Sequence, residues 1–290
     1  MGIEHWRINR TWIAEHGISQ EDLERVALSL LNVDTEASMV KAAQESAPTF
    51  PTTQRQWGYS AFLTQSVNDV PLFFKVYFFL HLRERLRFHL GLCRAVKGYD
   101  NIRRLHDMGV PSPAPVALLL KRNPCSALLI TEALSEGKTL AQWLRDSLAS
   151  ITSSPTLGPS AESNNLLRQL AVFLNRIHKQ GIYHRDLHDE NIWLSRSEDG
   201  GFLFQLLDVE AVTFCRRLSM RRRIKNLRRI AQNLATAAAM RQLDGETLAL
   251  EFANYYSDAS GLPASPRFLE IMKAAARRGM KRWKPTNLPD

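Results

Sequence analysis

The segment at residues 184–191 carries polar side chains whose types and spacing fit a chemical reaction. It reads His-Arg-Asp-Leu-His-Asp-Glu-Asn, with a carboxylate at Asp186 and an amide at Asn191. Phosphoryl transfer needs a carboxylate that orients the acceptor hydroxyl and another oxygen ligand that holds a divalent metal against the phosphates. The sequence therefore predicts Asp186 as a catalytic base and Asn191 as a metal ligand.

A second carboxylate, Asp208, follows an apolar run at residues 201–207. An acid at the end of a strand, beside another metal ligand, is typical of a magnesium site, because Mg²⁺ prefers a few hard oxygens together with phosphate oxygens and water. We expect Asp208 to be the second Mg²⁺ ligand. Standing alone, the same residue would indicate only a turn after a strand.

Lys75 lies within the apolar and aromatic stretch at residues 70–80. A lysine in the middle of such a strand is costly unless it has an anionic partner, and in a nucleotide site that partner is phosphate. We therefore predict that Lys75 binds the phosphate of a nucleotide. The alternative is a lysine on the solvent side of an edge strand. Gly58 and Ser60 lie where a phosphate-covering turn would sit, but no GxGxxG motif accompanies them.

Glu132 and Leu134 follow another apolar run, at residues 127–131. The pattern itself indicates that a strand ends there. A linker between two lobes at this point would place backbone groups near a purine ring, so we expect Glu132 and Leu134 to contact the nucleotide.

The elements that hold the 184–191 segment are also visible in the sequence. Apolar residues at 182–183 and 192–194 predict two short buried strands on either side of it. Before them, apolar residues repeat at helical spacing from Leu166 to Ile177 and stop at Gly181, which predicts a buried helix leading into the loop.

The N-terminal half combines predicted strands and helices. Residues 1–50 and 82–108 have helical patterns, whereas four other segments predict a small antiparallel sheet. The predicted strands are residues 57–63, 70–80, 116–120 and 127–131. Residues 140–148 and 216–234 predict helices in the C-terminal half. We therefore expect an α+β protein with two lobes, residues 1–132 and 133–290.

Composition favours a folded protein in a reducing compartment. The chain has 290 residues, of which 44% are hydrophobic, enough for one large core or two modest lobes. Its three cysteines are far apart and have no metal-ligand spacing, which argues against disulfides. No signal-peptide pattern and no run of about 18 apolar residues occurs, so we expect a soluble, cytoplasmic protein.

Positive charge gathers at the C-terminal end. The net charge is +9, and residues 216–290 alone hold 16 Lys or Arg against six Asp or Glu. Such an excess indicates an anionic partner: a phosphorylated substrate, an acidic membrane surface or nucleic acid. The cluster at residues 277–284 suits an acidic membrane, although a solvated helix end explains it equally well. No nucleic-acid-binding motif is present, which makes nucleic acid the weakest candidate.

Lys75, Asp186 with Asn191, and Asp208 occur in the order and at roughly the separations of the protein-kinase-like fold. More narrowly, the chain resembles the bacterial lipopolysaccharide kinase family, whose members phosphorylate heptose or 3-deoxy-manno-octulosonic acid (Kdo) in the inner core. The resemblance covers about residues 55–240. It rests on residues 73–77, 101–111, 183–188, 207–210 and 225–229.

The resemblance implies a bilobal fold with an antiparallel-sheet N-lobe and a mainly helical C-lobe. It also implies that Lys75 binds the α- and β-phosphates of ATP, that Asp186 is the base, and that Asn191 and Asp208 hold Mg²⁺. His188 stands where protein kinases carry a lysine, as is frequent in small-molecule kinases of this fold. The implied partners are the lipopolysaccharide core glycolipid and the acidic cytoplasmic face of the inner membrane.

Two departures from the kinase pattern bear on activity and acceptor. Gly98 stands where helix C usually supplies a glutamate for the lysine, which leaves Asp100 or another acid as the substitute. This departure favours the alternative of a pseudokinase that serves as a binding module or scaffold. Asp208 is followed by Val-Glu rather than Phe-Gly, and no Ala-Pro-Glu motif follows, so a sugar is favoured over a protein acceptor. Kinases for other small molecules or for proteins remain alternatives.

Overall fold

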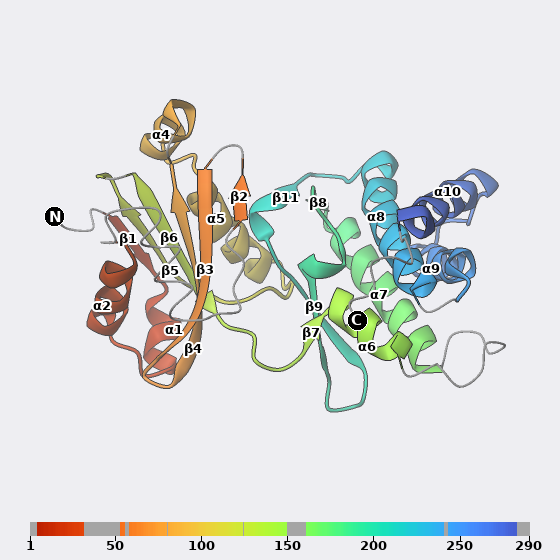
Figure 1. The fold of residues 1–290 in the computed structure, drawn as a ribbon, viewed down its shortest axis with the longest axis horizontal. Coiled ribbons are helices and arrows are strands. Elements are labelled where there is room, and N and C mark those ends of the chain that lie inside the picture. Colours follow the sequence, from red (N-terminus) through yellow and green to blue (C-terminus); the bar gives the residue numbers. More distant parts are fainter. Residues whose placement is uncertain are drawn as a thin grey trace. The chain divides into compact units, whose positions relative to one another are not determined.

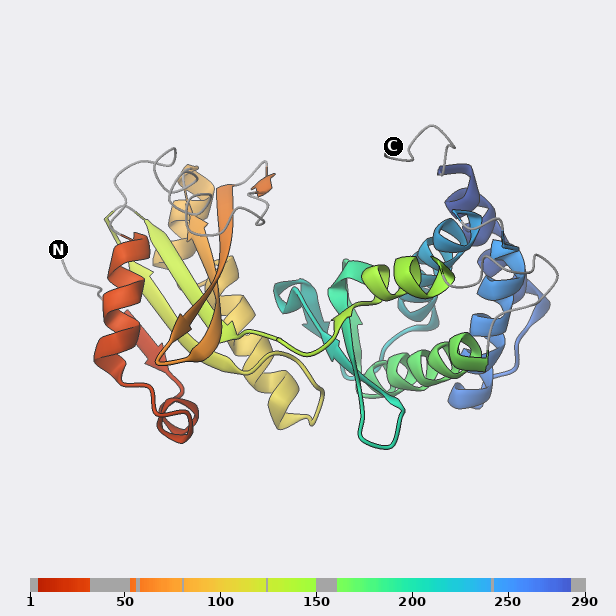
Figure 2. The same ribbon diagram turned by 60° about the horizontal axis from the view of Figure 1, so that its bottom comes forward.

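The computed structural model describes residues 5–31, 53–55, 58–79, 81–123, 125–149, 161–240 and 243–282. The chain divides into two compact units, Met1–Ser135 and Glu136–Asp290. The first is built on an antiparallel sheet and the second is mainly helical (Figures 1 and 2), so the predicted α+β class is confirmed. None of the helices among these residues is long and apolar enough to cross a membrane.

The described strands of the first unit form one antiparallel sheet in the order β1-β5-β6-β4-β3-β2. They are β1 (His5–Ile8), β2 (Thr53–Arg55), β3 (Gly58–Val67), β4 (Val70–Phe78), β5 (Pro115–Lys121) and β6 (Ser126–Glu132). Asn68 and Asp69 join β3 to β4 with φ values of 49° and 64°. Two positive φ angles are typical of the type I′ turn that suits a twisted hairpin, which confirms the polar turn expected there.

Helices cover both faces of this sheet. The first unit contains α1 (Arg10–Glu15), α2 (Gln20–Leu31), α4 (Leu82–His89) and α5 (Arg94–Asp107). Leu72, Phe74 and Val76 of β4 share a core with Leu23 and Leu31 of α2. Helix α5 contacts β5 and β6, and it lies on the other face from α2 (Figure 2). The predicted small sheet is thus the scaffold of this unit.

Two expectations for the first unit differ from the structure. Residues 5–8 form a strand, paired with β5, in a segment expected to be helical; pairing with a sheet edge decides its conformation, and that long-range contact leaves no local pattern. The helical pattern at residues 82–108 is two helices, because the chain turns at Gly91 with φ +68° and restarts at Arg94. Residues 32–50, the rest of the segment 1–50 that was expected to be helical, lie outside the described residues.

The second unit places short strands against a bundle of helices. Its helices are α6 (Leu140–Ala149), α7 (Ala161–Lys179), α8 (Met220–Ala239), α9 (Gly245–Ser260) and α10 (Pro266–Arg282). Its strands are β7 (Lys138–Thr139), β8 (Ile182–His184), β9 (Ile192–Arg196), β10 (Phe202–Leu206) and β11 (Val212–Phe214), with the 3₁₀ turns η1 (Asp189–Asn191) and η2 (Val209–Ala211). β10, β9 and β7 form one sheet, and β11 pairs with β8.

Gly181 makes the turn from α7 into β8. Its φ is +76°, and a Cβ atom there would overlap the carbonyl oxygen of Cys215. Cys215 donates its backbone N–H to the carbonyl of Gly181 at 2.9 Å. Only glycine fits this close approach. The buried helix and the two strands predicted around the loop are confirmed, and together they fix where the loop begins and ends.

Candidate active site

His184, the first residue of the loop at residues 184–191, anchors the loop to its neighbours. It is fully buried, its Nε2 lies 3.0 Å from the carbonyl oxygen of Leu207, and its own carbonyl accepts a 2.6 Å hydrogen bond from Nδ2 of Asn226 on α8. Burial lowers the pKa of His184, so the imidazole is neutral. A carbonyl only accepts, so Nε2 carries the proton. His184 therefore ties the loop both to the strand end before Asp208 and to α8.

Asn191 is held by its nitrogen end. Its Nδ2 donates to the backbone carbonyl of Asp186 at 2.9 Å and lies 2.9 Å from Nε2 of His188. Its backbone carbonyl accepts the N–H of Leu207 at 3.0 Å. The amide nitrogen is thus directed into the loop, which leaves the oxygen Oδ1 as the end suited to a hard cation.

Asp208 has an unusual backbone conformation directly beside Asn191. Its φ of 48° and ψ of 45° lie in the left-handed region, which is uncommon for a residue with a side chain and occurs often at functional sites. Its carbonyl accepts the N–H of Ala211 at 3.0 Å and closes the turn η2. The hydrogen bond between Leu207 and Asn191 holds the two predicted metal ligands together.

The oxygens of Asn191 and Asp208 suit Mg²⁺. One amide oxygen and one carboxylate form the small set of hard ligands that Mg²⁺ takes when phosphate oxygens and water complete its shell. Among the described residues, no three His, Cys, Asp or Glu side chains gather as an all-protein metal site. Phosphate oxygens and water would complete the shell of a metal ion held by Asn191 and Asp208.

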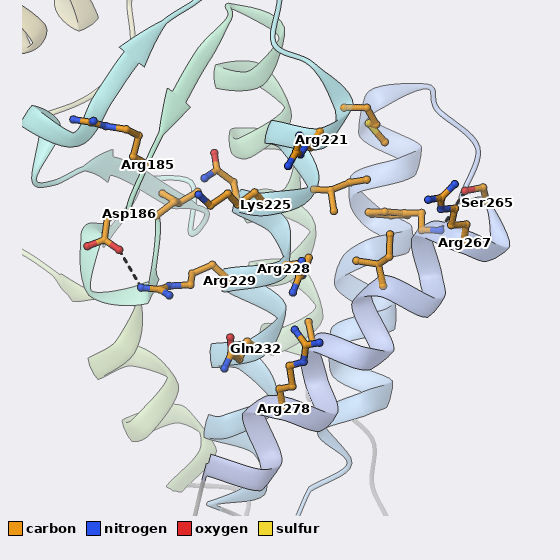
Figure 3. A pocket seen from close by; sticks show the side chains of 17 residues that line it. Arg185, Asp186, Arg221, Lys225, Arg228, Arg229, Gln232, Ser265, Arg267 and Arg278 are labelled. Atoms are coloured by element: carbon orange, nitrogen blue, oxygen red, sulfur yellow. Dashed lines mark hydrogen bonds and ion pairs between the residues drawn. The ribbon is translucent and has the colours of Figure 1, made fainter.

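The side chain of Asp186 lies at the mouth of the loop and pairs with a cation from α8. Its Oδ1 lies 3.0 Å from Nη2 of Arg229 (Figure 3). Nε2 of His188 is 3.8 Å from Oδ2. The Asp186 side chain is 46% exposed, so the carboxylate remains accessible. A carboxylate that is open to solvent at this position can orient an incoming hydroxyl and accept its proton.

A pocket of about 1090 Å³ opens beside Asp186, between the loop, α8 and α10 (Figure 3). Apolar side chains line part of the pocket, among them Ile224, Phe268 and Ile271. Asp186 is the one acid among the side chains that line it. The cations that line it are Arg185, Arg221, Lys225, Arg228, Arg229, Arg267 and Arg278. The lining therefore favours an anionic ligand with an apolar part.

Lys75, Glu132 and Leu134 belong to the first unit. Lys75 is buried at the centre of β4, opposite Phe62 on β3 and Leu129 on β6, so the edge-strand alternative is wrong. Because side chains alternate along a strand, it lies on the face away from Phe74, the face that α5 covers. Its Nζ lies 5.4 Å from the centroid of the Tyr77 ring.

Glu132 is the last residue of β6. Its N–H donates to Ala114, and its carbonyl accepts the Thr131 hydroxyl at 3.1 Å. Leu134 follows, partly exposed.

The acids proposed as partners for Lys75 can also be placed. Asp100 lies on α5 and forms an exposed 2.8 Å ion pair with Arg7. Asp100 is therefore engaged by Arg7 rather than reserved for Lys75. Gly98 is buried on the same helix.

The chain matches a family model described as the lipopolysaccharide kinase (Kdo/WaaP) family over residues 43–252. The chain belongs to this family. Among solved structures, "WaaP in complex with acyl carrier protein" is similar with a TM-score of 0.59 and 15% identity, covering 97% of this chain and 100% of that chain. This likeness shows a shared fold, and the family match confirms the lipopolysaccharide-kinase resemblance.

A second similar structure is the "Rio2 kinase-ADP/Mg2+-phosphoaspartate complex from Chaetomium thermophilum". Its TM-score is 0.43 at 12% identity, and the match covers 85% of this chain and 76% of that chain. No curated protein sequence matches the chain.

In this member of the lipopolysaccharide kinase family, α8 contacts both Asp186 and His184. The pattern at residues 216–234 predicts the helix but not these contacts. A signal was present, because Arg221, Lys225 and Arg229 recur at intervals of four residues and so share one helix face. That face lines the pocket.

Proposed function

We propose that this protein transfers the γ-phosphate of ATP to a sugar hydroxyl, of heptose or Kdo, in the inner core of lipopolysaccharide. Membership of the lipopolysaccharide kinase family supports a phosphotransferase that acts in lipopolysaccharide assembly. The observation that favours an anionic glycolipid as the acceptor is the cationic pocket beside Asp186. A glycolipid core with phosphate or carboxylate groups matches that lining, whereas a neutral sugar leaves most of the cations without a counter-charge.

In this proposal the carboxylate of Asp186 accepts the proton of the attacking hydroxyl. Lys75 binds the α- and β-phosphates of ATP, and backbone groups of Glu132 and Leu134 contact the purine. Oδ1 of Asn191 and the carboxylate of Asp208 would hold Mg²⁺, which supplies positive charge against the phosphates. Arg229 pairs with Asp186 and also lines the pocket, where it would bind an anionic group of the acceptor.

The path of the chain after Asp208 supports a sugar acceptor over a peptide. From η2 the chain enters β11, and α8 begins at Met220. Protein kinases use a longer segment at this point, ending in Ala-Pro-Glu, to position a peptide. The short connection leaves the α8 face open to the pocket instead. Inner-core glycolipid is assembled at the cytoplasmic face of the inner membrane, so we propose that the protein works at that surface.

A transfer assay tests this function. Purified protein, Mg²⁺ and γ-labelled ATP are incubated with core glycolipid that lacks the phosphate. We expect label on the glycolipid with the wild type, and none with Asp186→Asn. Asp199→Asn is the matched control, because Asp199 lies in the exposed turn between β9 and β10 and bonds only locally. A wild-type protein that binds ATP but transfers no phosphate would instead support the pseudokinase alternative.

A further inference from the structure

Helix α4 and the turn after it present four leucines to solvent. Leu82 is 82% exposed, Leu86 59%, Leu90 63% and Leu92 67%. A single exposed leucine is ordinary, but four within eleven residues are a concentration of exposed apolar side chains of the kind that marks an interaction site. We call these four residues the α4 leucine surface. Figure 1 shows α4 at one end of the first unit's sheet.

The opposite side of α4 is its anchored side. Phe88 is 4% exposed and its ring lies 5.2 Å from that of Phe79, and Glu84 is 6% exposed. Residues 84 and 88 are one helical turn apart and share a face, as do residues 82, 86 and 90 on the other side. The helix therefore already has a buried face, and the leucines form a second apolar face directed outward.

Arginines flank the leucines on both sides. At 100° per residue, Arg83 and Arg87 fall on one side of the leucine row, and Arg85 and His89 fall on the other. All four side chains are exposed. The only acid of the helix, Glu84, is buried on the inner face. The outward half of α4 thus combines an apolar stripe with positive borders and no exposed acid.

We propose that the α4 leucine surface docks this protein onto an anionic lipid bilayer. A helix lying in the membrane interface buries its apolar face among the upper acyl chains, while arginines on its borders reach the headgroup phosphates. In α4, the leucines match the acyl chains and the arginines beside them match the anionic headgroups. This inference rests on the exposure and charge of the first unit, and it holds whether or not the proposed kinase reaction is correct.

The basic cluster at residues 277–284 was also expected to suit a membrane, but some of its cations have other contacts within the protein. Arg277 pairs with Glu246 at 2.9 Å, and Arg278 lines the pocket beside Asp186. Lys281 and Arg282 are exposed at the end of α10. They provide charge without an apolar stripe such as that of α4, so we expect them to contribute less to membrane binding.

Vesicle sedimentation of the full-length protein tests the proposal. The vesicles are pure phosphatidylcholine, or phosphatidylcholine with 30% phosphatidylglycerol, at low and high salt. We expect binding to the anionic vesicles and weak binding to the neutral ones. Leu86→Ser with Leu90→Ser weakens partition about tenfold or more, and Arg83→Gln with Arg85→Gln weakens it by about fivefold per arginine at low salt.

Matched controls separate docking from general effects. Leu203→Ser changes a leucine that is 55% exposed in β10 of the other unit, and we expect it to bind vesicles as the wild type does. Because the substituted leucines are exposed, the melting temperature stays unchanged. The proposal is overturned if the wild type ignores anionic vesicles, or if Leu86→Ser with Leu90→Ser binds them normally. It is also overturned if Lys281→Gln with Arg282→Gln abolishes binding while the leucine variant retains it.

Discussion

Nη2 of Arg229 lies 3.0 Å from Oδ1 of Asp186, so the helix α8 supplies a cation directly to the predicted catalytic carboxylate. The pair is about half exposed, which makes its contribution to stability small. Its interest lies in function, because the same guanidinium borders the pocket proposed for the acceptor.

Arg229→Gln tests both roles of Arg229, as the partner of Asp186 and as a side chain that lines the pocket. Under the proposed function, loss of the guanidinium removes both a partner of Asp186 and a contact for the anionic acceptor. We expect kcat/KM for the glycolipid to fall about 10- to 100-fold, roughly 1.4 to 3 kcal/mol of transition-state stabilisation, with Arg229→Lys less impaired. Steady-state kinetics measure this change. A matched control is Arg217→Gln, an exposed arginine before α8 that does not line the pocket. Equal kinetics for Arg229→Gln and the wild type would contradict this role.

Lys75→Met tests nucleotide binding in the first unit. If Lys75 binds the phosphates, this variant loses ATP affinity by about 100-fold, because a buried charge-assisted contact is removed. The control is Lys121→Met. Lys121 is another buried lysine of the same sheet, but its Nζ donates to the backbone carbonyl of Leu31. We expect Lys121→Met to bind ATP normally in calorimetric titration. Unchanged affinity in Lys75→Met argues against the phosphate role.

Gly181→Ala tests the turn that sets the start of the catalytic loop. A Cβ atom there overlaps the Cys215 carbonyl and the backbone φ is +76°, so we expect a loss of roughly 4 kcal/mol or more in the free energy of unfolding. Gly200→Ala is the control. Gly200 has a similar φ of +79° but open space around it, so its substitution costs about 1 kcal/mol. Urea unfolding measures both values, and equal losses would contradict the close-approach argument.

His178 predicts a pH dependence of stability. It is buried on α7, with Nδ1 2.8 Å from the Tyr256 hydroxyl, and burial lowers its pKa from 6.5 to about 4. The unfolded chain takes up a proton below pH 6.5, whereas the native protein resists protonation until about pH 4. The free energy of unfolding therefore falls as the pH drops through this window, by on the order of 3 kcal/mol.

Urea titrations at several pH values check this prediction. His178→Gln reduces the dependence on pH, and His184, whose pKa burial also lowers, accounts for part of what remains. If stability is flat between pH 6.5 and 4, His178 is not buried in its neutral form.

The sequence predicted the parts of the site that depend on local pattern. The strands on either side of residues 184–191, the helix ending at Gly181 and the strand before Asp208 each follow from periodicity and turn residues. The backbone strain at Asp208, the pairing of residues 5–8 with β5, and the contact between Arg229 and Asp186 depend on tertiary packing. Such packing brings residues 43 positions apart to one place without any local trace in the chain.

The break between α4 and α5 is another feature that the local sequence pattern does not predict. A helical pattern runs through residues 82–108, and the chain nevertheless turns at Gly91. The local pattern identified helix-forming residues correctly but not the turn, because Gly91 adopts its positive φ between two helices that face different surroundings. That turn leaves the leucines of α4 facing outward.

The central claim is that Asp186 drives phosphorylation of the lipopolysaccharide core. Mass spectrometry of core oligosaccharide tests it most directly, in cells that produce either the wild-type protein or Asp186→Asn at equal abundance. The account predicts that the core from the variant lacks one phosphate group at a heptose or Kdo, and that Asp199→Asn cells keep it. Identical core masses in wild-type and Asp186→Asn cells would contradict the account.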